Sequence, residues 1–308
     1  MTSAGTAGTV TRAGALGVRT VALTLLALVA FASNSLLTRL ALGSRQLDAA
    51  SFTAIRLASG AVMLAAIVLA QSRSWQALRG SGLAGPLALF AYAAPFSFAY
   101  LRIGAAVGAL VLFGVVQLTM IGYGIARGER PSATIWLGLV LAAAGLALLT
   151  VPSVTRPDPL GVLLMAIAGV AWAVYTLVGR GTTNPVAANA RSFFWSAPLA
   201  IALVLVVIGS HPDAAPSARG IGLALVSGAV TSGLGYAIWY RALPSLSVTQ
   251  AAVAQLSVPV IAALGAVAVL GEAVSSRLVF AGVLVLSGVG LVLSARARQP
   301  RVQRSTRA

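Results

Sequence analysis

Long apolar stretches, separated by short segments that contain arginine or proline, dominate the chain. A bilayer core of about 30 Å is crossed by roughly 20 apolar residues in a helix. Windows of this length predict ten transmembrane helices. The predicted spans are residues 20–42, 49–71, 83–102, 104–126, 133–152, 159–180, 191–209, 219–241, 247–270 and 277–295.

The first span resembles a cleavable signal peptide, because Arg19 precedes an apolar run that reaches the small residues around Ala32. The run nevertheless continues to about Leu42, and it has a counterpart later in the chain. We therefore interpret it as a membrane span. The terminal segments 1–19 and 296–308 are small, polar or basic, and they predict disordered cytoplasmic tails.

The composition supports an all-α integral membrane protein. Apolar residues make up 59% of the chain and charged residues only 8%, against roughly 25% in soluble domains. The net charge of +16 would suggest a nucleic-acid partner in a soluble protein. Here the arginines lie between and beyond the apolar stretches, which is typical of membrane protein loops. We therefore expect the lipid bilayer, and not nucleic acid, as the partner of this surface.

The distribution of arginines predicts that both termini are cytoplasmic. This orientation places 14 arginines inside and six outside, with Arg56 within a span. Positive charge is enriched on the cytoplasmic side of membrane proteins. Because the chain has no lysine and is rich in alanine, we expect a bacterial protein of the cytoplasmic membrane.

The residues that are missing exclude most enzyme chemistry. Without lysine the chain has no Walker A loop and no Schiff base, and without cysteine it has no thiolate or iron–sulfur cluster. His211 is the single histidine, so no histidine pair can hold a catalytic zinc. We therefore expect no catalytic residue, no metal and no cofactor, and we interpret the chain as not an enzyme.

An internal repeat organises the ten spans. Residues 104–150 align with 247–293 at a constant offset of 143. Five helices per half make the second half enter the membrane in the opposite sense, which gives inverted repeats typical of secondary transporters. The matched pairs are Gly122 with Gly265, Gly128 with Gly271, Glu129 with Glu272, Ser132 with Ser275, Val140 with Val283, Leu141 with Leu284, Gly145 with Gly288 and Leu148 with Leu291.

Specific motifs add a family resemblance. At an offset of 141, Ala30-Phe31-Ala32 in the first span faces Ala171-Trp172-Ala173 in the sixth. The two halves, 20–152 and 159–295, resemble EamA-like repeats of the drug/metabolite transporter superfamily. The matching pieces are the corners Arg127-Gly128-Glu129-Arg130 and Leu270-Gly271-Glu272, the pair Trp172-Ala173 with Tyr175, and Arg56 early in the second span.

The resemblance implies a central cavity lined mainly by helices one to four and six to nine, with helices five and ten as scaffold. It also implies transport of a small metabolite, such as an amino acid or an amphipathic compound. One position departs from the common pattern, because Val116 stands opposite Pro259. A kink in the fourth helix is therefore in doubt.

Polar residues within the spans are candidates for substrate contact. Arg56 could bind a substrate carboxylate, or it could snorkel outward or tie helix ends together. The amide of Asn34 could serve a ligand or a neighbouring helix equally well. Gln117 and Gln255, in helices four and nine, could contact substrate, although hydrogen bonding between helices is the more usual role.

Aromatic stripes could form the walls of the cavity. Tyr92, Phe96 and Tyr100 recur every four residues in the third helix. Because Tyr100, Trp239 and Tyr240 lie near predicted helix ends, interfacial anchoring is favoured for them. The full set of predicted substrate-binding residues is Asn34, Arg56, Tyr92, Phe96, Gln117, Trp172, Tyr175, Tyr236 and Gln255.

The remaining features favour structural roles. Glu129 and Glu272 precede the fifth and tenth helices, where a carboxylate complements the positive end of the next helix. Small-residue spacings, such as Gly138 to Gly145 and Gly282, Gly288 and Gly290, favour close helix packing and are compatible with a homodimer face.

We therefore expect a secondary exporter or permease of small metabolites that uses alternating access. No acidic residue lies within a span, which weakly favours facilitated transport or exchange. The alternatives are a nucleotide-sugar-like or other organic-solute exchanger, a membrane scaffold without transport, and an enzyme that acts on lipid.

Overall fold

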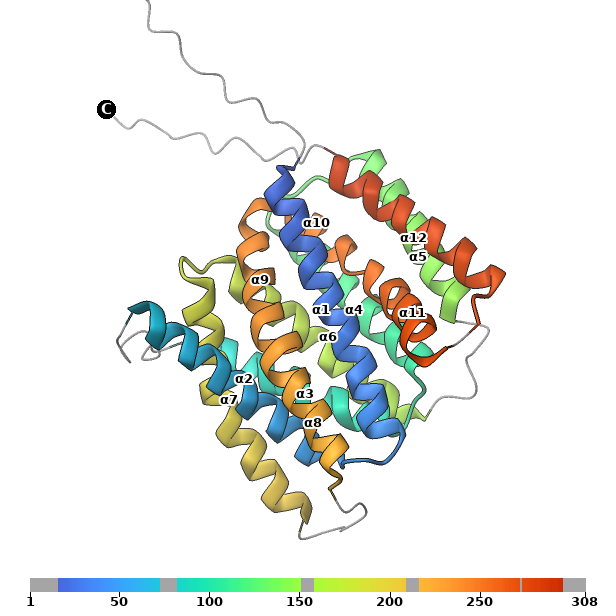
Figure 1. The fold of residues 1–308 in the computed structure, drawn as a ribbon. Helices are drawn as coiled ribbons and strands as arrows, with labels where there is room; N and C mark the ends of the chain where they lie inside the picture. Colours follow the sequence, from blue (N-terminus) through green and yellow to red (C-terminus); the bar gives the residue numbers. More distant parts are fainter. Residues whose placement is uncertain (1–15, 73–81, 151–157, 209–215, 272, 296–308) are drawn as a thin grey trace, which may run out of the picture.

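The computed structural model describes residues 16–72, 82–150, 158–208, 216–271 and 273–295, and every regular element among them is helical (Figure 1). The elements are α1 (Val18–Gly43), α2 (Ala49–Ser72), α3 (Ala84–Tyr100), α4 (Ala105–Ala126), α5 (Ala133–Thr150), α6 (Pro159–Arg180), α7 (Pro185–Ile208), α8 (Ala218–Val226), η3 (Ser227–Leu234), α9 (Gly235–Ala242), η4 (Leu243–Ser245), α10 (Val248–Ala254), α11 (Ser257–Leu270) and α12 (Ser276–Ser294).

These elements form a bundle of membrane-crossing length. Among the described residues, nine helical spans of 18 residues or more are apolar enough to cross a bilayer, with α8 to η4 and α10 to α11 each counted as one. The remaining predicted span is α3, which has 17 residues and no charged side chain. The described part of the chain is therefore a multi-pass membrane protein, as the apolar windows predict.

The repeat seen in the sequence has its counterpart in the helix boundaries. The starts of α4 and α5 are each 143 residues before those of α10 and α12, and α1 starts 141 residues before α6. Contacts between the halves also occur in equivalent pairs. In one direction, α3 and α4 of the first half pack on α6 of the second. In the other, their counterparts α8, α9 and α11 pack on α1.

Two spans of the second half are interrupted near the middle. The eighth span contains η3, a π-helical segment between α8 and α9. The ninth span is broken between α10 and α11, because Pro259 has no N–H to donate to the carbonyl of Gln255. In the first half, α4 runs unbroken past Val116. The proline of the ninth helix therefore has no counterpart, and the fourth helix has no break.

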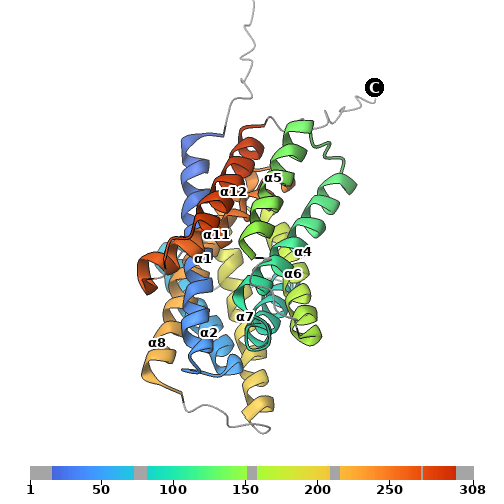
Figure 2. The same cartoon turned by 90° about the vertical axis from the view of Figure 1, so that its right-hand side faces the viewer.

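Helices α5 and α12 lie side by side along one edge of the bundle (Figures 1 and 2). A Cβ atom on Gly138 would lie 2.6 Å from the backbone oxygen of Gly288, and one on Gly145 would lie 2.8 Å from the oxygen of Ala281. These small residues allow the backbones to approach closely. Gly138, Gly145 and Gly288 are therefore used for packing inside the molecule, and a homodimer face stays a prediction.

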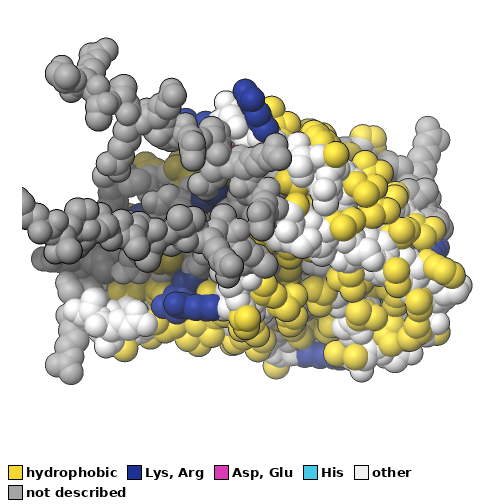
Figure 3. All heavy atoms as spheres, turned by 90° about the horizontal axis from the view of Figure 1, so that it is seen from above, with side chains coloured by type: hydrophobic (Ala, Val, Ile, Leu, Met, Phe, Trp, Pro, Cys, Tyr) yellow, Lys and Arg dark blue, Asp and Glu magenta, His cyan; other side chains and the backbone are white. Residues whose placement is uncertain are grey.

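The outer surface of the bundle is apolar. Large side chains on several helices are strongly exposed, among them Leu118 at 78%, Leu205 at 71% and Phe280 at 66%. Hydrophobic side chains cover much of the face visible in Figure 3, and arginines stand singly among them. Such a surface is stable against lipid and would aggregate in water.

The predicted ends of the spans need one correction. Helix α7 begins at Pro185, six residues before the predicted start at 191, so Arg191 lies within the helix and not in the preceding loop. Arg180 and Arg241 are also helical, each in a last turn. Of the predicted tails, 1–19 and 296–308, residues 1–15 and 296–308 lie outside the described residues, as does His211, whereas Val18 and Arg19 belong to α1.

Candidate functional site

Two adjoining cavities lie between the halves of the molecule. The inner one is narrow, and both repeats contribute to its wall. Its lining residues are Phe31, Asn34, Ser35, Tyr92, Phe96, Leu112, Phe113, Trp172, Tyr236, Gln255 and Val258. Six of the predicted substrate-binding residues are therefore brought together here, from α1, α3, α6, α9 and the break before α11.

The outer cavity has a volume of about 270 Å³ and shares Ser35, Phe96 and Phe113 with the inner one. It extends toward the end of the bundle at which α1, α3 and α5 finish, and it reaches the exposed side chain of Arg39. Helix α5 contributes Leu149 and Thr150 to this cavity. The fifth helix thus adds only its last residues to the outer cavity and none to the inner one, while it packs along α12.

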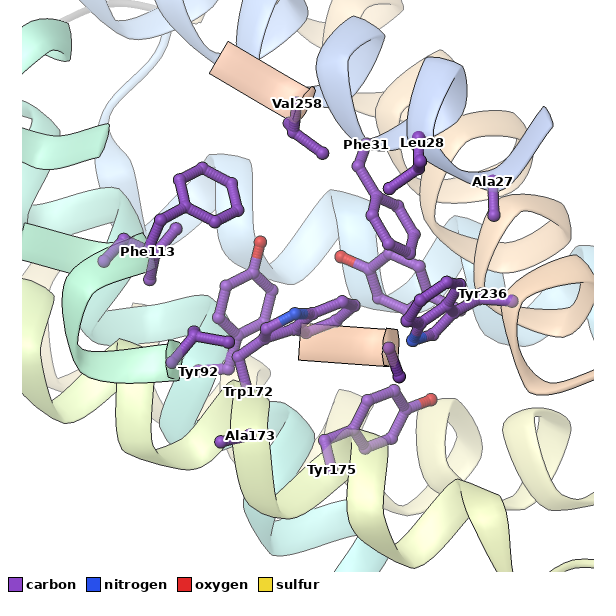
Figure 4. Packing of buried hydrophobic residues seen from close by; sticks show 14 of the residues in the cluster. Ala27, Leu28, Phe31, Tyr92, Phe113, Trp172, Ala173, Tyr175, Tyr236 and Val258 are labelled. Atoms are coloured by element: carbon purple, nitrogen blue, oxygen red, sulfur yellow. The ribbon is translucent and has the colours of Figure 1, made fainter. Parts of the chain in front are cut away.

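Aromatic rings enclose the inner cavity (Figure 4). The ring of Trp172 lies 4.8 Å from those of Tyr92 and Tyr236 and 5.2 Å from that of Phe31, measured between centroids. The spacing of Tyr92, Phe96 and Tyr100 does form one stripe, with successive centroids 5.3 and 4.7 Å apart. Such rings favour an apolar or aromatic ligand body.

Phe31 was not among the predicted residues, although the repeat contains the signal for it. Phe31 and Trp172 are equivalent at the offset of 141, and their rings pack edge to face at the centre of the bundle. Residues near the axis of an inverted repeat meet their own counterparts. The Ala-aromatic-Ala pattern therefore marks the interface between the halves.

The amide of Asn34 connects the cavity to the π-helical segment. Its oxygen accepts hydrogen bonds from Ser227 Oγ at 2.7 Å and from Thr231 and Ser232 at 3.4 Å. Its nitrogen has no hydrogen-bond partner in the part of the chain that the structure describes. Asn34 therefore serves a neighbouring helix with one end of its amide and leaves a donor for the cavity with the other.

Arg56 lies directly behind the cavity wall and is completely buried. Its Nε donates to Ser232 Oγ at 2.9 Å, and its Nη2 donates to the hydroxyl of Tyr236. The guanidinium also lies 5.4 Å from the ring centroid of Tyr92 and 5.9 Å from that of Phe96. Arg56 therefore does not snorkel outward, and it connects α2 to η3, α9 and α3.

Gln255 lies at the break in the ninth span and holds the central tryptophan. Trp172 Nε1 donates to Gln255 Oε1, while Gln255 Nε2 donates to the carbonyl of Ala251 at 3.0 Å. Gln117 makes the expected interhelical bond, to the carbonyl of Ala252 at 2.6 Å, and it does not line either cavity.

The remaining aromatic candidates lie deeper in the bundle. The hydroxyl of Tyr175 donates to Asn189 Oδ1 at 2.6 Å, and that of Tyr240 donates to the carbonyl of Tyr175 at 2.8 Å. Tyr175 does not line either cavity. Trp239 and Tyr240 are buried to within 1%, so the expectation that they anchor at the membrane interface is wrong.

Of the two predicted corner carboxylates, Glu129 and Glu272, the structure describes the first. Glu129 accepts hydrogen bonds from the backbone nitrogens of Val248 and Thr249 at 2.7 and 3.1 Å, and from Thr249 Oγ1 at 2.7 Å. It therefore caps α10 of the other half and not the helix that follows it. Glu272 lies outside the described residues.

Comparisons with known proteins agree with this architecture. The sequence profile of the EamA-like transporter family matches residues 159–294. A solved crystal structure of a protein superposes with a TM-score of 0.77 over 91% of this chain and 99% of that chain, at 20% identity, which shows the shared fold.

Relatives extend the match to nearly the whole chain. An uncharacterized protein of Pseudomonas aeruginosa is 46% identical over 94% of this chain and 98% of its own. Proteins described as uncharacterized transporters in Archaeoglobus fulgidus and Bacillus subtilis are 25% and 29% identical over 82% of this chain, and over 91% and 86% of their own. The chain therefore belongs to the EamA-like transporter family and is a membrane transporter.

Proposed function

We propose that the protein is a secondary exporter or permease of small amphipathic metabolites in a bacterial cytoplasmic membrane, with both termini in the cytoplasm. The observation that carries this proposal is the aromatic cavity at the interface of the two repeats. Its wall combines rings from both halves with the amides of Asn34 and Gln255. A mostly apolar wall with a few polar groups suits a small organic ligand.

The arrangement of contacts supports alternating access. The outer cavity lies toward the end marked by Arg39 and Thr150. At the opposite end, Glu129 of the first half accepts hydrogen bonds from the start of α10 of the second, and Gln117, from the middle of α4, donates to the same helix. Inverted repeats can open one end of a central cavity and close the other by rocking one half against the other.

The residues that line the cavities offer no group that would couple transport to a proton gradient. All five acidic residues of the chain lie outside the described helices, so the spans contain no carboxylate relay for protons. This arrangement supports facilitated transport or exchange.

Uptake and counterflow in proteoliposomes test the proposal. A panel of labelled amino acids and other small metabolites is compared for the wild type, Trp172→Ala and Trp136→Ala. Trp172 is central to the cavity, whereas Trp136 lies on α5 and is 45% exposed on the outer surface. We expect saturable flux in the wild type and in Trp136→Ala, and its loss in Trp172→Ala. Absence of flux for every compound would favour a scaffold without transport.

A further inference from the structure

The cation of Arg56 has no negative partner among the residues that the structure describes. The side chain is fully buried in a membrane-spanning helix. All five acidic residues of the chain, Asp48, Glu129, Asp158, Asp213 and Glu272, lie between the described helices. A charge within a membrane span is unfavourable without a partner, and such charges mark functional sites by default.

The hydrogen bonds of Arg56 are also incomplete. A guanidinium carries five N–H donors on three nitrogens. Two nitrogens donate to the neutral hydroxyls of Ser232 and Tyr236. The third, Nη1, has no acceptor among the described residues. The described part of the chain therefore supplies neither the charge nor all the acceptors that this side chain requires.

Three residues place this positive charge beside the inner cavity. Tyr92, Phe96 and Tyr236 line the cavity on one side and contact Arg56 on the other. The oxygen of Tyr236 accepts from Arg56, so its own O–H can donate to a ligand or to the neighbouring hydroxyl of Tyr92. The free amide nitrogen of Asn34 is a further donor on the same wall. Hydrogen-bond donors backed by a cation match an anionic group.

We infer that the substrate is a small organic anion, whose carboxylate occupies the inner cavity beside Tyr92, Tyr236 and Asn34. Its apolar body extends into the outer cavity, whose own lining residues include Leu36, Ala109 and Ala262. This inference rests on the proposed transport function and defines the substrate class of the same site. Arg56 acts in it as a positioning residue that supplies charge through the tyrosines.

The composition of both walls supports an anion over a cation. Among the described residues, no acidic side chain lines either cavity, so a substrate ammonium would find no ionic partner in these walls.

A purely structural role of Arg56 would lead to a different experimental result. If the guanidinium only tied α2 to α9, ligand charge would not affect binding. Three ligands of one skeleton distinguish these cases: 3-phenylpropionate is an anion, 3-phenylpropionamide is neutral, and 3-phenylpropylamine is a cation. Binding is measured by calorimetry on the full chain in lipid nanodiscs, with empty nanodiscs to correct for partition into lipid.

We expect the anion to bind about tenfold or more tightly than the amide, as for a charge-assisted contact, and the amine to bind weakest. Arg56→Met should abolish this preference, Arg56→Lys should retain part of it, and the matched control Arg219→Met should retain all of it. Thermal unfolding of each variant shows whether it is folded.

Binding of the three ligands to the wild type is sufficient to overturn the inference, whether or not the variants fold. Binding of the amide or the amine as tight as that of the anion would contradict an anion site while leaving a transporter in place. An unchanged anion preference in a folded Arg56→Met variant would also contradict it. By contrast, failure of the proposed function itself would appear as absence of flux for every compound in the proteoliposome panel.

Discussion

The carboxylate of Glu129 accepts a hydrogen bond from the backbone nitrogen of Val248, 119 positions later in the chain, at 2.7 Å. The same carboxylate accepts from the backbone and the hydroxyl of Thr249. The negative charge thus lies at the positive end of the broken ninth span, where an anion is favoured. The contact joins the two halves at the end of the bundle opposite the outer cavity.

Replacing Glu129 by Gln should loosen this end of the bundle. The amide keeps the size of the side chain and loses its charge, and hydrogen bonds to charged groups are worth about 1.5–3 kcal/mol each. The chain has no cysteine, so a single Thr176→Cys substitution, in the half of α6 near this end, reports access cleanly. We expect a hydrophilic maleimide to label this cysteine several-fold faster in the Glu129→Gln background.

The control for this prediction is Arg130→Gln, which changes an exposed neighbouring residue at the same corner. Equal labelling rates with and without the Glu129 substitution would show that the cap does not hold this end closed.

Substitution of Gly138 by Ala should weaken the contact between α5 and α12. The added methyl group would lie 2.6 Å from the backbone oxygen of Gly288, and the helices would have to separate. Overpacking of this kind typically costs about 1–3 kcal/mol. Thermal unfolding in detergent measures the loss, and Gly290→Ala is the matched control because nothing lies within 4 Å of its added Cβ. Equal melting temperatures of the two variants would contradict the assigned packing.

Substitution of Asn34 by Asp should interfere with anion binding while preserving the fold. The new carboxylate would keep the acceptor that Ser227 and Ser232 use. It would also supply, within the cavity, the negative charge that Arg56 lacks. We expect binding of 3-phenylpropionate to weaken by about tenfold or more, with less effect on the amide. Asn34→Gln, which keeps the neutral amide, is the comparison; similar losses in both variants would indicate a steric cause.

Asp158 makes a pH-dependent contribution at the start of α6, outside the spans. The backbone N–H of Gly161, and then Arg102 at 3.0 Å, lower the pKa of this carboxyl below its ordinary value. Its stabilising effect is therefore complete above the ordinary pKa and is lost as the pH falls through the lower folded-state value. We expect a small fall in melting temperature over this acidic range, which Asp158→Asn should reduce. Identical pH profiles of the two proteins would contradict this role.

The length and order of the apolar stretches were sufficient to predict the membrane spans and the repeat. A bilayer accepts only segments whose backbone hydrogen bonds are satisfied internally, so about 20 apolar residues must form a helix whatever surrounds them. The offsets of 143 and 141 reappear in the helix starts for the same reason. The aromatic-alanine pairs at Phe31 and Trp172 likewise indicated where the halves meet.

Tertiary structure decided which face of each helix forms the site. These helices are apolar on every side, because lipid and protein interior favour the same residues, so the sequence carries little signal for their rotation. Only packing places Arg56 behind the cavity, Tyr175 deeper in the bundle and Tyr236 in the wall. Only packing joins Glu129 to α10, because a carboxylate at a corner can cap any helix end within reach. The sequence by itself thus determined the spans and their symmetry, and the tertiary structure determined which side chains meet at the centre.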